Sequence, residues 1–289
     1  MERGIIPEER FAGPLDLELT LTSGQSFLWR RQPGDDGNGP WFRTVDGETV
    51  LAVREVEEGL EWRATADPTD RIRTRLGLDD DLPSVLEAFP DEPVLQAAKT
   101  RLEGLRLLEE PVVPTLFSFI LSAQMRIGRI HDLVTALRET YGRPRPFEET
   151  VPTFPDPDRL AEATEAELRE LGLGYRAPYV LETATMLDEG DFEFDSIREL
   201  NYESARERLT QLVGVGPKVA DCVLLFGLGR SEPVPLDTWI RTAIEEHFPE
   251  ADADSYAETS RRIRSRLGPR PGYAQTYVFT HLRTGGGGD

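Results

Sequence analysis

The alternation of apolar and polar residues predicts β-structure in the first part of the chain. In "LDLELTLTSGQSFLW" leucines occupy every second position from Leu15 to Leu21, which predicts a strand that ends in a Ser-Gly turn. The run "WFRTVDGETVLAVREV" contains two β-rich halves joined by Asp46 and Gly47, a strong hairpin signal. With one more strand in "GLEWRATA", these runs predict a twisted antiparallel sheet that ends near Asp67.

From about Leu82 the apolar positions recur with a helical period. "DLPSVLEAFPDEPVLQAAKTRLEGLRLL" holds two amphipathic segments, and the helical pattern after it can break near Ala123 and Gln124. In all, about eight helices with short links predict an all-α domain. The sequence therefore predicts an α+β protein, and we expect its divisions to be an N-terminal antiparallel β domain over residues 1–81, a helical domain over residues 82–284 and a flexible tail over residues 285–289.

The cysteine and histidine content limits the chemistry of any site. Cys222 is the single cysteine, which excludes an intramolecular disulfide, a four-cysteine iron–sulfur cluster and a cysteine-rich zinc site. The three histidines have spacings that match no metal motif. Apolar runs are too short to span a bilayer, and because the first residues are charged and mixed we expect no export signal. We therefore expect a cytoplasmic protein without a metal, a cofactor or membrane contact.

The net charge is 33 − 53 = −20, and arginine carries almost all of the positive charge. Such acidity ordinarily argues against a nucleic-acid partner, because phosphate binding is built on basic surface. Acidic, lysine-poor surfaces also suit proteins that work in multimolar salt, and we take the charge as a hypothesis about a halophilic cell. Arginines nevertheless gather locally, with five against two acids in residues 121–145 and six without any acid in residues 261–283. Solvated helix faces explain either segment equally well.

The stretch "LVGVGPKVADC" places a lysine directly after a glycine turn. Gly214, Val215 and Gly216 have the pattern of a helix–hairpin–helix, whose backbone N–H groups form a phosphate cradle, although an ordinary corner between helices is the alternative. Lys218 falls in the first turn of a helix, where the helix dipole and partial burial favour the neutral, nucleophilic amine. Asp237 precedes another helix, where its carboxylate can act as an N-cap and also lie beside the amine.

Together, "GVGPKVADC" and "VPLD" resemble the helix–hairpin–helix/Gly-Pro-Asp superfamily of base-excision DNA glycosylases, in which the lysine marks the bifunctional glycosylase/lyases. The similarity covers most of the chain and is greatest to the eukaryotic-type 8-oxoguanine DNA glycosylases. It includes "LTSGQSFLWR", "LFSFILSAQMRIGRI", "LGLGYRAPYV" and "GYAQTYVF", in the family's order. The resemblance implies a monomer without a cofactor that binds double-stranded DNA and flips 8-oxoguanine, preferentially opposite cytosine, into a pocket between the domains.

The same resemblance implies roles for the catalytic and base-pocket residues. Lys218 attacks the anomeric carbon, expels the base and forms a Schiff base, after which β-elimination nicks the strand. Asp237 stabilises the positive charge that builds on the sugar. The backbone carbonyl of Gly24 accepts the N–H that 8-oxoguanine has at position seven and guanine lacks. Phe279 stacks on the flipped base and Gln275 binds its Watson–Crick edge. A plain turn explains Gly24 otherwise, and helix packing explains the other two.

Three further positions match the family's DNA contacts. Arg129 and Arg176 correspond to arginines that read the orphaned cytosine, whose acceptors suit guanidinium groups. Tyr175 corresponds to a wedge that enters the base stack. We therefore expect these side chains to face DNA.

Other positions depart from the family's pattern. Gln124 stands where an asparagine commonly fills the vacated space, which leaves the cytosine preference open, and Arg126 replaces a further asparagine and adds charge. Trp239 stands where a histidine usually contacts phosphate, and an indole N–H can donate one hydrogen bond but no charge. Cys222 matches a cysteine near the lysine in the family, but burial in a helix core explains it equally well.

Two other functions remain open from the residues. An alkylbase glycosylase shares the expected fold but would not need Lys218 or an equivalent of Gly24. A non-catalytic DNA-binding module could use the hairpin alone. Adenine-mismatch glycosylases and endonuclease III usually carry a cysteine-held cluster, which a single cysteine cannot build.

Overall fold

The computed structural model describes residues 1–34 and 39–285 of the chain. Five strands form an antiparallel sheet in the order β1-β5-β4-β3-β2, which confirms the predicted N-terminal sheet. The predicted hairpin joins β3 to β4, where Asp46 pairs with Thr49 and Gly47 has a φ of 57°. The strands are β1 (Glu2–Pro7), β2 (Arg30–Gln32), β3 (Trp41–Asp46), β4 (Thr49–Val56) and β5 (Gly59–Ala64).

Helix α1 (Leu17–Thr22) occupies the segment with alternating leucines, so the strand predicted there is wrong. The Asp16 side chain caps this helix by accepting a hydrogen bond from the Leu19 N–H at 2.8 Å. Leu17 and Leu21 are also four residues apart, and both pack into the core beneath the sheet, whereas Leu19 packs against the helical core. The helix therefore lies between two apolar cores, and its leucines pack into both of them.

The remainder is mostly helical, which confirms the predicted α+β class. The break predicted near Ala123 and Gln124 is also confirmed, because α5 ends at Leu121, α6 begins at Ile127 and Gln124 has a φ of 52°. The other helices are α2 (Thr69–Arg75), α3 (Leu82–Glu87), α4 (Pro93–Arg101), α5 (Val112–Leu121), α6 (Ile127–Tyr141), α7 (Pro157–Ala161), α8 (Glu165–Glu170), α9 (Ala177–Asp188), α10 (Asp195–Arg198), α11 (Tyr202–Leu209), α12 (Pro217–Gly227), α13 (Thr238–His247), α14 (Tyr256–Arg266) and α15 (Pro271–Gly285).

Three details of the structure were not expected from the sequence. A two-stranded hairpin of β6 (Pro144–Pro146) and β7 (Thr150–Pro152) follows α6 and was not predicted. The predicted flexible tail overlaps α15, which includes Gly285, and the rest of that tail lies outside the described residues. Helices α1 and α2 also fall within the segment expected to form the β domain.

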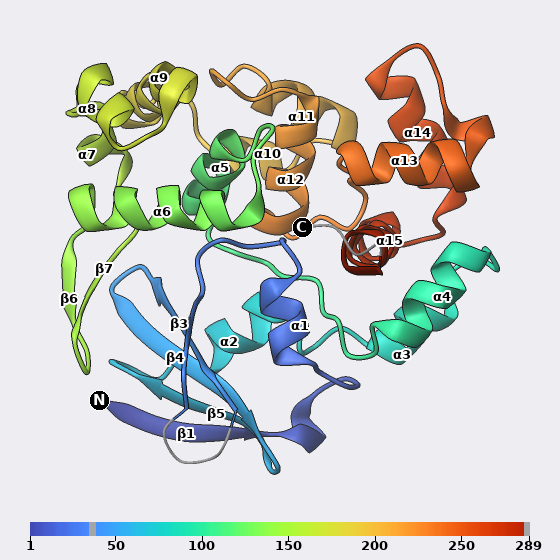
Figure 1. The fold of residues 1–289 in the computed structure, drawn as a ribbon, viewed down its shortest axis with the longest axis horizontal. Coiled ribbons are helices and arrows are strands. Elements are labelled where there is room, and N and C mark those ends of the chain that lie inside the picture. Colours follow the sequence, from blue (N-terminus) through green and yellow to red (C-terminus); the bar gives the residue numbers. More distant parts are fainter. Residues whose placement is uncertain (35–38, 286–289) are drawn as a thin grey trace.

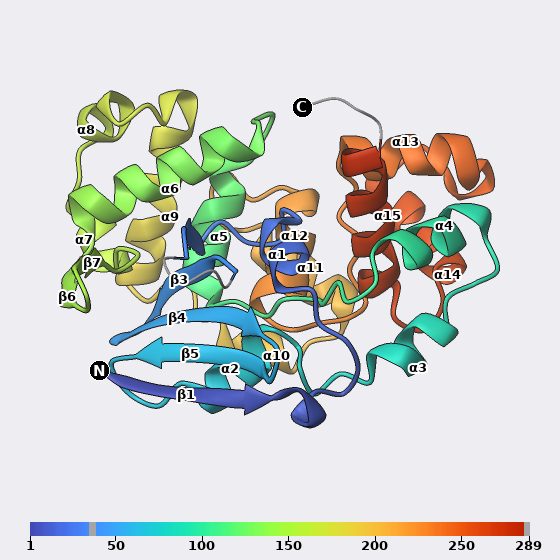
Figure 2. The ribbon, with the colours of Figure 1, turned by 60° about the horizontal axis from the view of Figure 1, so that its bottom comes forward.

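The sheet lies on one side of the molecule and most helices lie on the other, with α1 between them (Figures 1 and 2). Helix α12 packs against α5 and α11, and α15 packs against α4 and α13. Every residue of α12 from Val219 to Gly227 is buried. Because the helix is packed along this length, its first turn has a fixed position. Lys218, which directly precedes Val219, lies in that turn.

Candidate active site

A cavity of about 1060 Å³ opens where several distant segments meet. The segment after α1, the link between α5 and α6, the start of α12, the segment that enters α13, and α15 all contribute to its wall. Ten of the predicted site residues line it: Gly24, Gln124, Arg126, Arg129, Lys218, Cys222, Asp237, Trp239, Gln275 and Phe279. The fold therefore brings residues that span more than 250 positions of sequence to one cavity, since Gly24 and Phe279 are 279 − 24 = 255 positions apart.

Lys218 and Asp237 both face this cavity from helix N-termini. Lys218 follows Pro217 in the first turn of α12, and its Nζ donates a hydrogen bond to Ser122 Oγ at 3.3 Å. Asp237 caps α13, because its Oδ1 accepts a hydrogen bond from the Ile240 N–H at 2.8 Å. Burial raises the pKa of the Asp237 carboxyl, while two backbone N–H groups at the start of α13 and the charge of Lys218 oppose the rise. The amine and the carboxylate thus act on each other electrostatically.

Cys222 lies one helical turn after Lys218 and is almost completely buried. Burial raises the pKa of its thiol to about 12, although Lys218 opposes this rise by its charge and a hydrogen bond. The thiol therefore stays protonated at neutral pH, and it forms an uncharged part of the cavity wall rather than a nucleophile.

Gly24 forms a tight turn at the opposite wall. It has a φ of 95°, and a Cβ placed on it would lie 3.1 Å from Ile127 Cδ1 and 3.4 Å from Phe279 Cε1. Gln275 is buried on the same helix as Phe279 and donates a hydrogen bond to Thr276 Oγ1 at 2.7 Å. A glycine, an aromatic ring and a buried amide thus border one space.

The residue after Gly24 holds this turn in place. Gln25 is buried, and its Nε2 donates hydrogen bonds to Ser23 Oγ at 3.0 Å and to the Arg106 carbonyl at 2.8 Å. Its Oε1 accepts a hydrogen bond from the Leu108 N–H at 3.0 Å. These bonds fix the turn to the segment between α4 and α5, so the Gly24 carbonyl has a defined direction.

The remaining predicted DNA contacts do not line the cavity. Tyr175 is half exposed, and its ring lies 6.1 Å from that of Tyr179 in an edge-to-face arrangement. Arg176 is buried, donates a hydrogen bond to the Ala123 carbonyl and stacks 4.2 Å above the Tyr175 ring. In this conformation the Arg176 guanidinium is held between the Ala123 carbonyl and the Tyr175 ring.

The glycine turn joins α11 to α12 as the hairpin pattern predicts. Gly214 has a φ of 76° and packs against Tyr179, so a Cβ on it would lie 2.6 Å from the Tyr179 Cβ. Val215 is buried, whereas Gly214 and Gly216 are exposed. The turn therefore anchors one side chain in the core and presents its glycine backbone to solvent.

Sequence reasoning missed several residues of the cavity wall. Ser122 is the hydrogen-bond acceptor of Lys218, and the Phe119 ring lies with its centroid 5.4 Å from Nζ. Both residues lie just before the break between α5 and α6, and that predicted break was the only signal in the sequence that pointed to them. The packing of α5 on α12 is what brings them next to Lys218. Gln25 and Arg241 also line the cavity and were not predicted.

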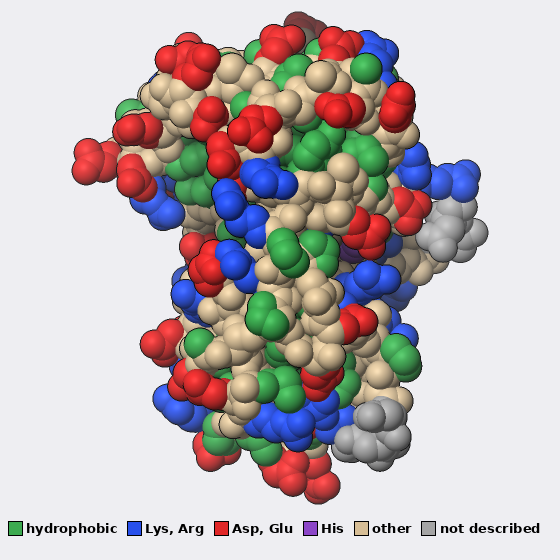
Figure 3. Space-filling model, turned by 90° about the vertical axis from the view of Figure 1, so that its left-hand side faces the viewer, with side chains coloured by type: hydrophobic (Ala, Val, Ile, Leu, Met, Phe, Trp, Pro, Cys, Tyr) green, Lys and Arg blue, Asp and Glu red, His purple; other side chains and the backbone are tan. Residues whose placement is uncertain are grey.

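Charge is distributed unevenly around the cavity. Many arginines elsewhere bind carboxylates, as Arg54 binds Glu61 and Arg264 binds Glu203. Within the part of the chain that the structure describes, Arg126 and Arg241 line the cavity without an acidic partner. On the face shown in Figure 3, acidic side chains cover much of the upper part, and Lys and Arg side chains lie across the middle and at the lower end. The acidic protein thus keeps uncompensated positive charge at this cavity.

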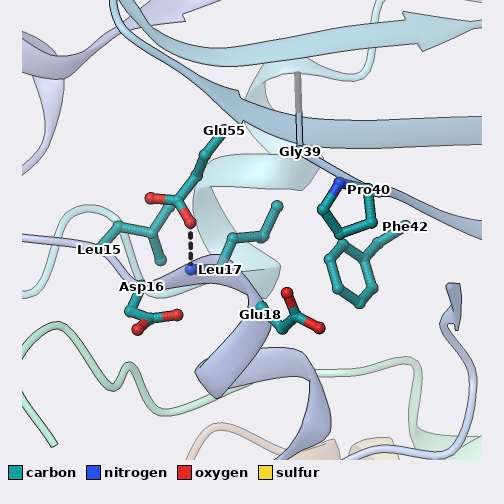
Figure 4. Close-up of a pocket in the computed structure, with 8 residues that line it drawn as sticks. All are labelled: Leu15, Asp16, Leu17, Glu18, Gly39, Pro40, Phe42 and Glu55. Atoms are coloured by element: carbon teal, nitrogen blue, oxygen red, sulfur yellow. Dashed lines mark hydrogen bonds between the residues drawn. The ribbon is translucent and has the colours of Figure 1, made fainter. Parts of the chain in front are cut away.

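A second cavity of about 380 Å³ lies between the start of α1 and the sheet (Figure 4). The Glu55 carboxyl accepts a hydrogen bond from the Leu17 N–H at 2.7 Å, and burial raises its pKa. None of the predicted site residues lines this cavity. Among the described residues, no cluster of histidine, cysteine and acidic side chains could hold a metal ion, and no helix is long and apolar enough to cross a membrane.

The glycine hairpin, the lysine that follows it and the helix-capping aspartate define the helix–hairpin–helix class of DNA-repair proteins. Residues 117–269 match the family described as HhH-GPD superfamily base excision DNA repair protein. The chain belongs to this superfamily, as its resemblance predicted.

Its relatives are similar over most of the chain. It is 32% identical to a protein of Methanothermobacter thermautotrophicus named "Probable N-glycosylase/DNA lyase", over 95% of both chains. It is 34% identical to the N-glycosylase/DNA lyase of Saccharomyces cerevisiae, over 78% of this chain and 66% of the yeast protein. It also resembles the crystal structure of the Clostridium acetobutylicum 8-oxoguanine glycosylase/lyase in complex with double-stranded DNA containing cytosine opposite 8-oxoguanine. That likeness has a TM-score of 0.85 and 27% sequence identity over 94% of this chain and 93% of the other.

Proposed function

We propose that this protein is a bifunctional DNA glycosylase/lyase that excises 8-oxoguanine from double-stranded DNA in base-excision repair. The observation that carries the proposal is the meeting of Lys218 and Asp237 in one cavity at the end of a helix–hairpin–helix. The names of the relatives support the same activity. The cavity is also large enough for a flipped base, since small-molecule sites commonly measure about 300–1000 Å³.

In this proposal Lys218 forms the covalent bond with DNA. Its neutral Nζ attacks the anomeric carbon, the bond to the base breaks, and the base leaves with the electron pair and takes up a proton. The sugar ring opens to a protonated imine, and loss of a proton from the 2′ carbon then breaks the C3′–O bond to the phosphate. Asp237 stabilises the positive charge on the sugar, and its raised pKa makes it a better proton acceptor when Lys218 loses its proton.

Base recognition falls to the opposite wall of the cavity. The Gly24 carbonyl accepts the N–H at position seven of 8-oxoguanine, which guanine lacks. Phe279 stacks on the base and Gln275 binds its Watson–Crick edge, for which its amide must turn away from Thr276. Cys222 contributes an uncharged surface beside the lysine. We place this pocket between the β domain of residues 1–81, which supplies Gly24, and the helical domain of residues 82–284.

Duplex DNA would lie across the mouth of the cavity. The exposed backbone of Gly214 and Gly216 binds a phosphate, Val215 anchors that turn, and Tyr175 enters the base stack. Gln124 fills the space that the flipped base leaves. The DNA-facing residues of the proposal are Gln124, Arg126, Arg129, Tyr175, Arg176, Gly214, Val215, Gly216 and Trp239.

Preference for cytosine opposite the lesion requires Arg129 and Arg176 to read that base. Arg129 is half exposed and weakly paired with Asp132 at 3.9 Å, so it can turn to DNA readily. Arg176 must first release the Ala123 carbonyl. The preference would therefore depend more on Arg129 than on Arg176.

The uncompensated arginines explain how an acidic protein can bind DNA. Arg126 and Arg241 supply the charge that Trp239 lacks, while the net charge of −20 suits a monomer that works in the salty cytoplasm of a halophile. Full folding and activity in dilute buffer would contradict the halophilic part of this proposal, without bearing on the reaction.

Covalent trapping tests the reaction directly. Borohydride reduces a Schiff base, so incubation with a duplex that contains 8-oxoguanine should leave a stable protein–DNA adduct. The sequence has only two lysines, Lys99 and Lys218, which provides a matched pair of variants. Lys218→Gln should abolish the adduct. Lys99→Gln should leave it unchanged, because Lys99 lies on α4 and its Nζ donates a hydrogen bond to the Leu86 carbonyl.

No adduct with the unaltered protein, or an adduct that survives Lys218→Gln, would contradict the proposal. Release of an alkylated base without an adduct would indicate an alkylbase glycosylase instead, and binding without reaction would indicate a DNA-binding module.

A further inference from the structure

A carboxyl group that is not among the residues lining the cavity is buried in α12. Asp221 has no exposed surface, and it lies three residues after Lys218 in a helix whose other buried residues are apolar apart from the thiol. Its Oδ1 accepts a hydrogen bond from the Tyr202 hydroxyl at 2.8 Å, and its Oδ2 accepts one from the Tyr256 hydroxyl at 2.7 Å. A buried carboxyl is costly unless it is satisfied in this way, and burial raises its pKa to about 7 against the effect of both donors.

One of the two tyrosines also contacts the segment that presents Asp237. The Tyr256 oxygen accepts a hydrogen bond from the Leu236 N–H at 3.2 Å, and Leu236 directly precedes Asp237. A single hydroxyl therefore joins the helix that carries Lys218 to the backbone that carries Asp237. The path runs through two hydrogen bonds, from Asp221 to Tyr256 and from Tyr256 to Leu236.

The other tyrosine makes no such connection in the described hydrogen bonds. The Tyr202 hydroxyl lies 3.1 Å from Ser260 Oγ and accepts a hydrogen bond from Arg206 Nη1 at 3.0 Å. Those contacts join α11 and α14 behind α12, and they do not include the residues before α13. The two hydroxyls thus share one acceptor, Asp221. The Tyr256 hydroxyl also binds the Leu236 N–H, whereas the Tyr202 hydroxyl contacts Ser260 and Arg206.

We propose that Tyr256, held by Asp221, is a positioning residue that sets the place of Asp237 relative to Lys218. The proposal rests on the proposed function and explains why a buried carboxyl occurs one turn from the nucleophile. Asp237 must lie close enough to the sugar to stabilise its charge, and a displacement of about 1 Å in such a group can lower a rate by on the order of 100-fold. The N-cap bond to Ile240 orients the carboxylate, but it holds Asp237 only to its own helix.

The variants Tyr256→Phe and Tyr202→Phe form a matched pair. Each keeps the ring and removes one hydroxyl donor from Asp221, and only Tyr256→Phe also frees the Leu236 N–H. The readout is the single-turnover rate of 8-oxoguanine excision at saturating protein, measured with the affinity for the same duplex and the midpoint of thermal unfolding. Tyr256→Phe should lower the rate by about tenfold or more with little change in affinity. Tyr202→Phe should lower the midpoint of thermal unfolding at least as much as Tyr256→Phe does, because the Tyr202 hydroxyl contacts Asp221, Ser260 and Arg206. It should keep the excision rate within about threefold of that of the unaltered protein.

Hydrogen exchange of the Leu236 amide gives a second measurement on the folded proteins. Exchange should be faster in Tyr256→Phe than in Tyr202→Phe, because only the first variant removes its acceptor. Equal losses of rate in the two variants, or an unchanged rate in Tyr256→Phe, would overturn the positioning role. A parent protein without any excision activity would instead contradict the proposed function, and the adduct experiment detects that failure separately.

Discussion

Replacement of Gly24 by alanine tests whether this turn reads the damaged base. The change adds one methyl group at a φ of 95°, where an L-residue is strained by about 1–2 kcal/mol. The new Cβ would lie 3.1 Å from Ile127 Cδ1 and 3.4 Å from Phe279 Cε1. Ile127 Cδ1 is the end of a flexible side chain and can move, so the backbone strain dominates the loss of stability.

The strain has a consequence for recognition. Relaxation toward a negative φ turns the peptide after Gly24, and the carbonyl that Gln25 helps to aim then points elsewhere. Loss of one hydrogen bond to the base, or of the repulsion against guanine, amounts to about 1–3 kcal/mol. The preference for 8-oxoguanine over guanine should therefore fall by on the order of 10-fold to 100-fold.

The assay compares the Kd for duplexes that contain 8-oxoguanine or guanine opposite cytosine, in protein that also carries Lys218→Gln so that the strand is not cut. Gly47→Ala is the matched control, because Gly47 also has a positive φ, of 57°, but lies in the β3–β4 hairpin with no atom within 4 Å of an added Cβ. The control should lose comparable stability and keep the full preference. If Gly24→Ala also keeps the preference while losing stability, Gly24 does not read the base.

Two further predictions concern the carboxyl groups of Asp237, which caps α13, and Asp221, which is buried in α12. Asp237→Asn should keep the helix cap, because asparagine caps as well as aspartate, and so should fold and bind DNA normally, while single-turnover excision falls by roughly 10²- to 10⁴-fold. An unchanged excision rate would exclude its proposed role. Burial raises the pKa of Asp221 to about 7, although its two tyrosine donors and the charges of Arg206 and Arg264 lower it. Between about pH 4 and pH 7 the carboxyl group is therefore protonated in the folded state and ionised in the unfolded state. Rising pH therefore lowers the free energy of unfolding by up to about 1.4 kcal/mol per pH unit in this window, and Asp221→Asn should remove that contribution. Urea unfolding of both proteins at pH 5, 6, 7 and 8 measures it, and a difference in stability that does not vary with pH would contradict the inference.

The local signals in the sequence predicted much of the fold. The Asp46-Gly47 turn, the helical periods after residue 81 and the break near Gln124 all depend on neighbouring residues, and all appear in the structure. The alternating leucines of α1 were misread because residues 17 and 21 share a face in a helix as well as in a strand. The helix forms instead of a strand because the Asp16 side chain caps it and because its leucines pack into the two cores on either side of it.

The sequence by itself determined the family and predicted which residues would carry its chemistry, since the glycine turn, Lys218 and Asp237 lie close together along the chain and their order is a motif. Only the tertiary structure decided which side chains hold them in place. Ser122 reaches Lys218 across 96 positions and Tyr256 reaches Asp221 across 35. Such partners have no fixed spacing, because a hydrogen bond depends on distance and direction in space, and these are set by how the helices pack.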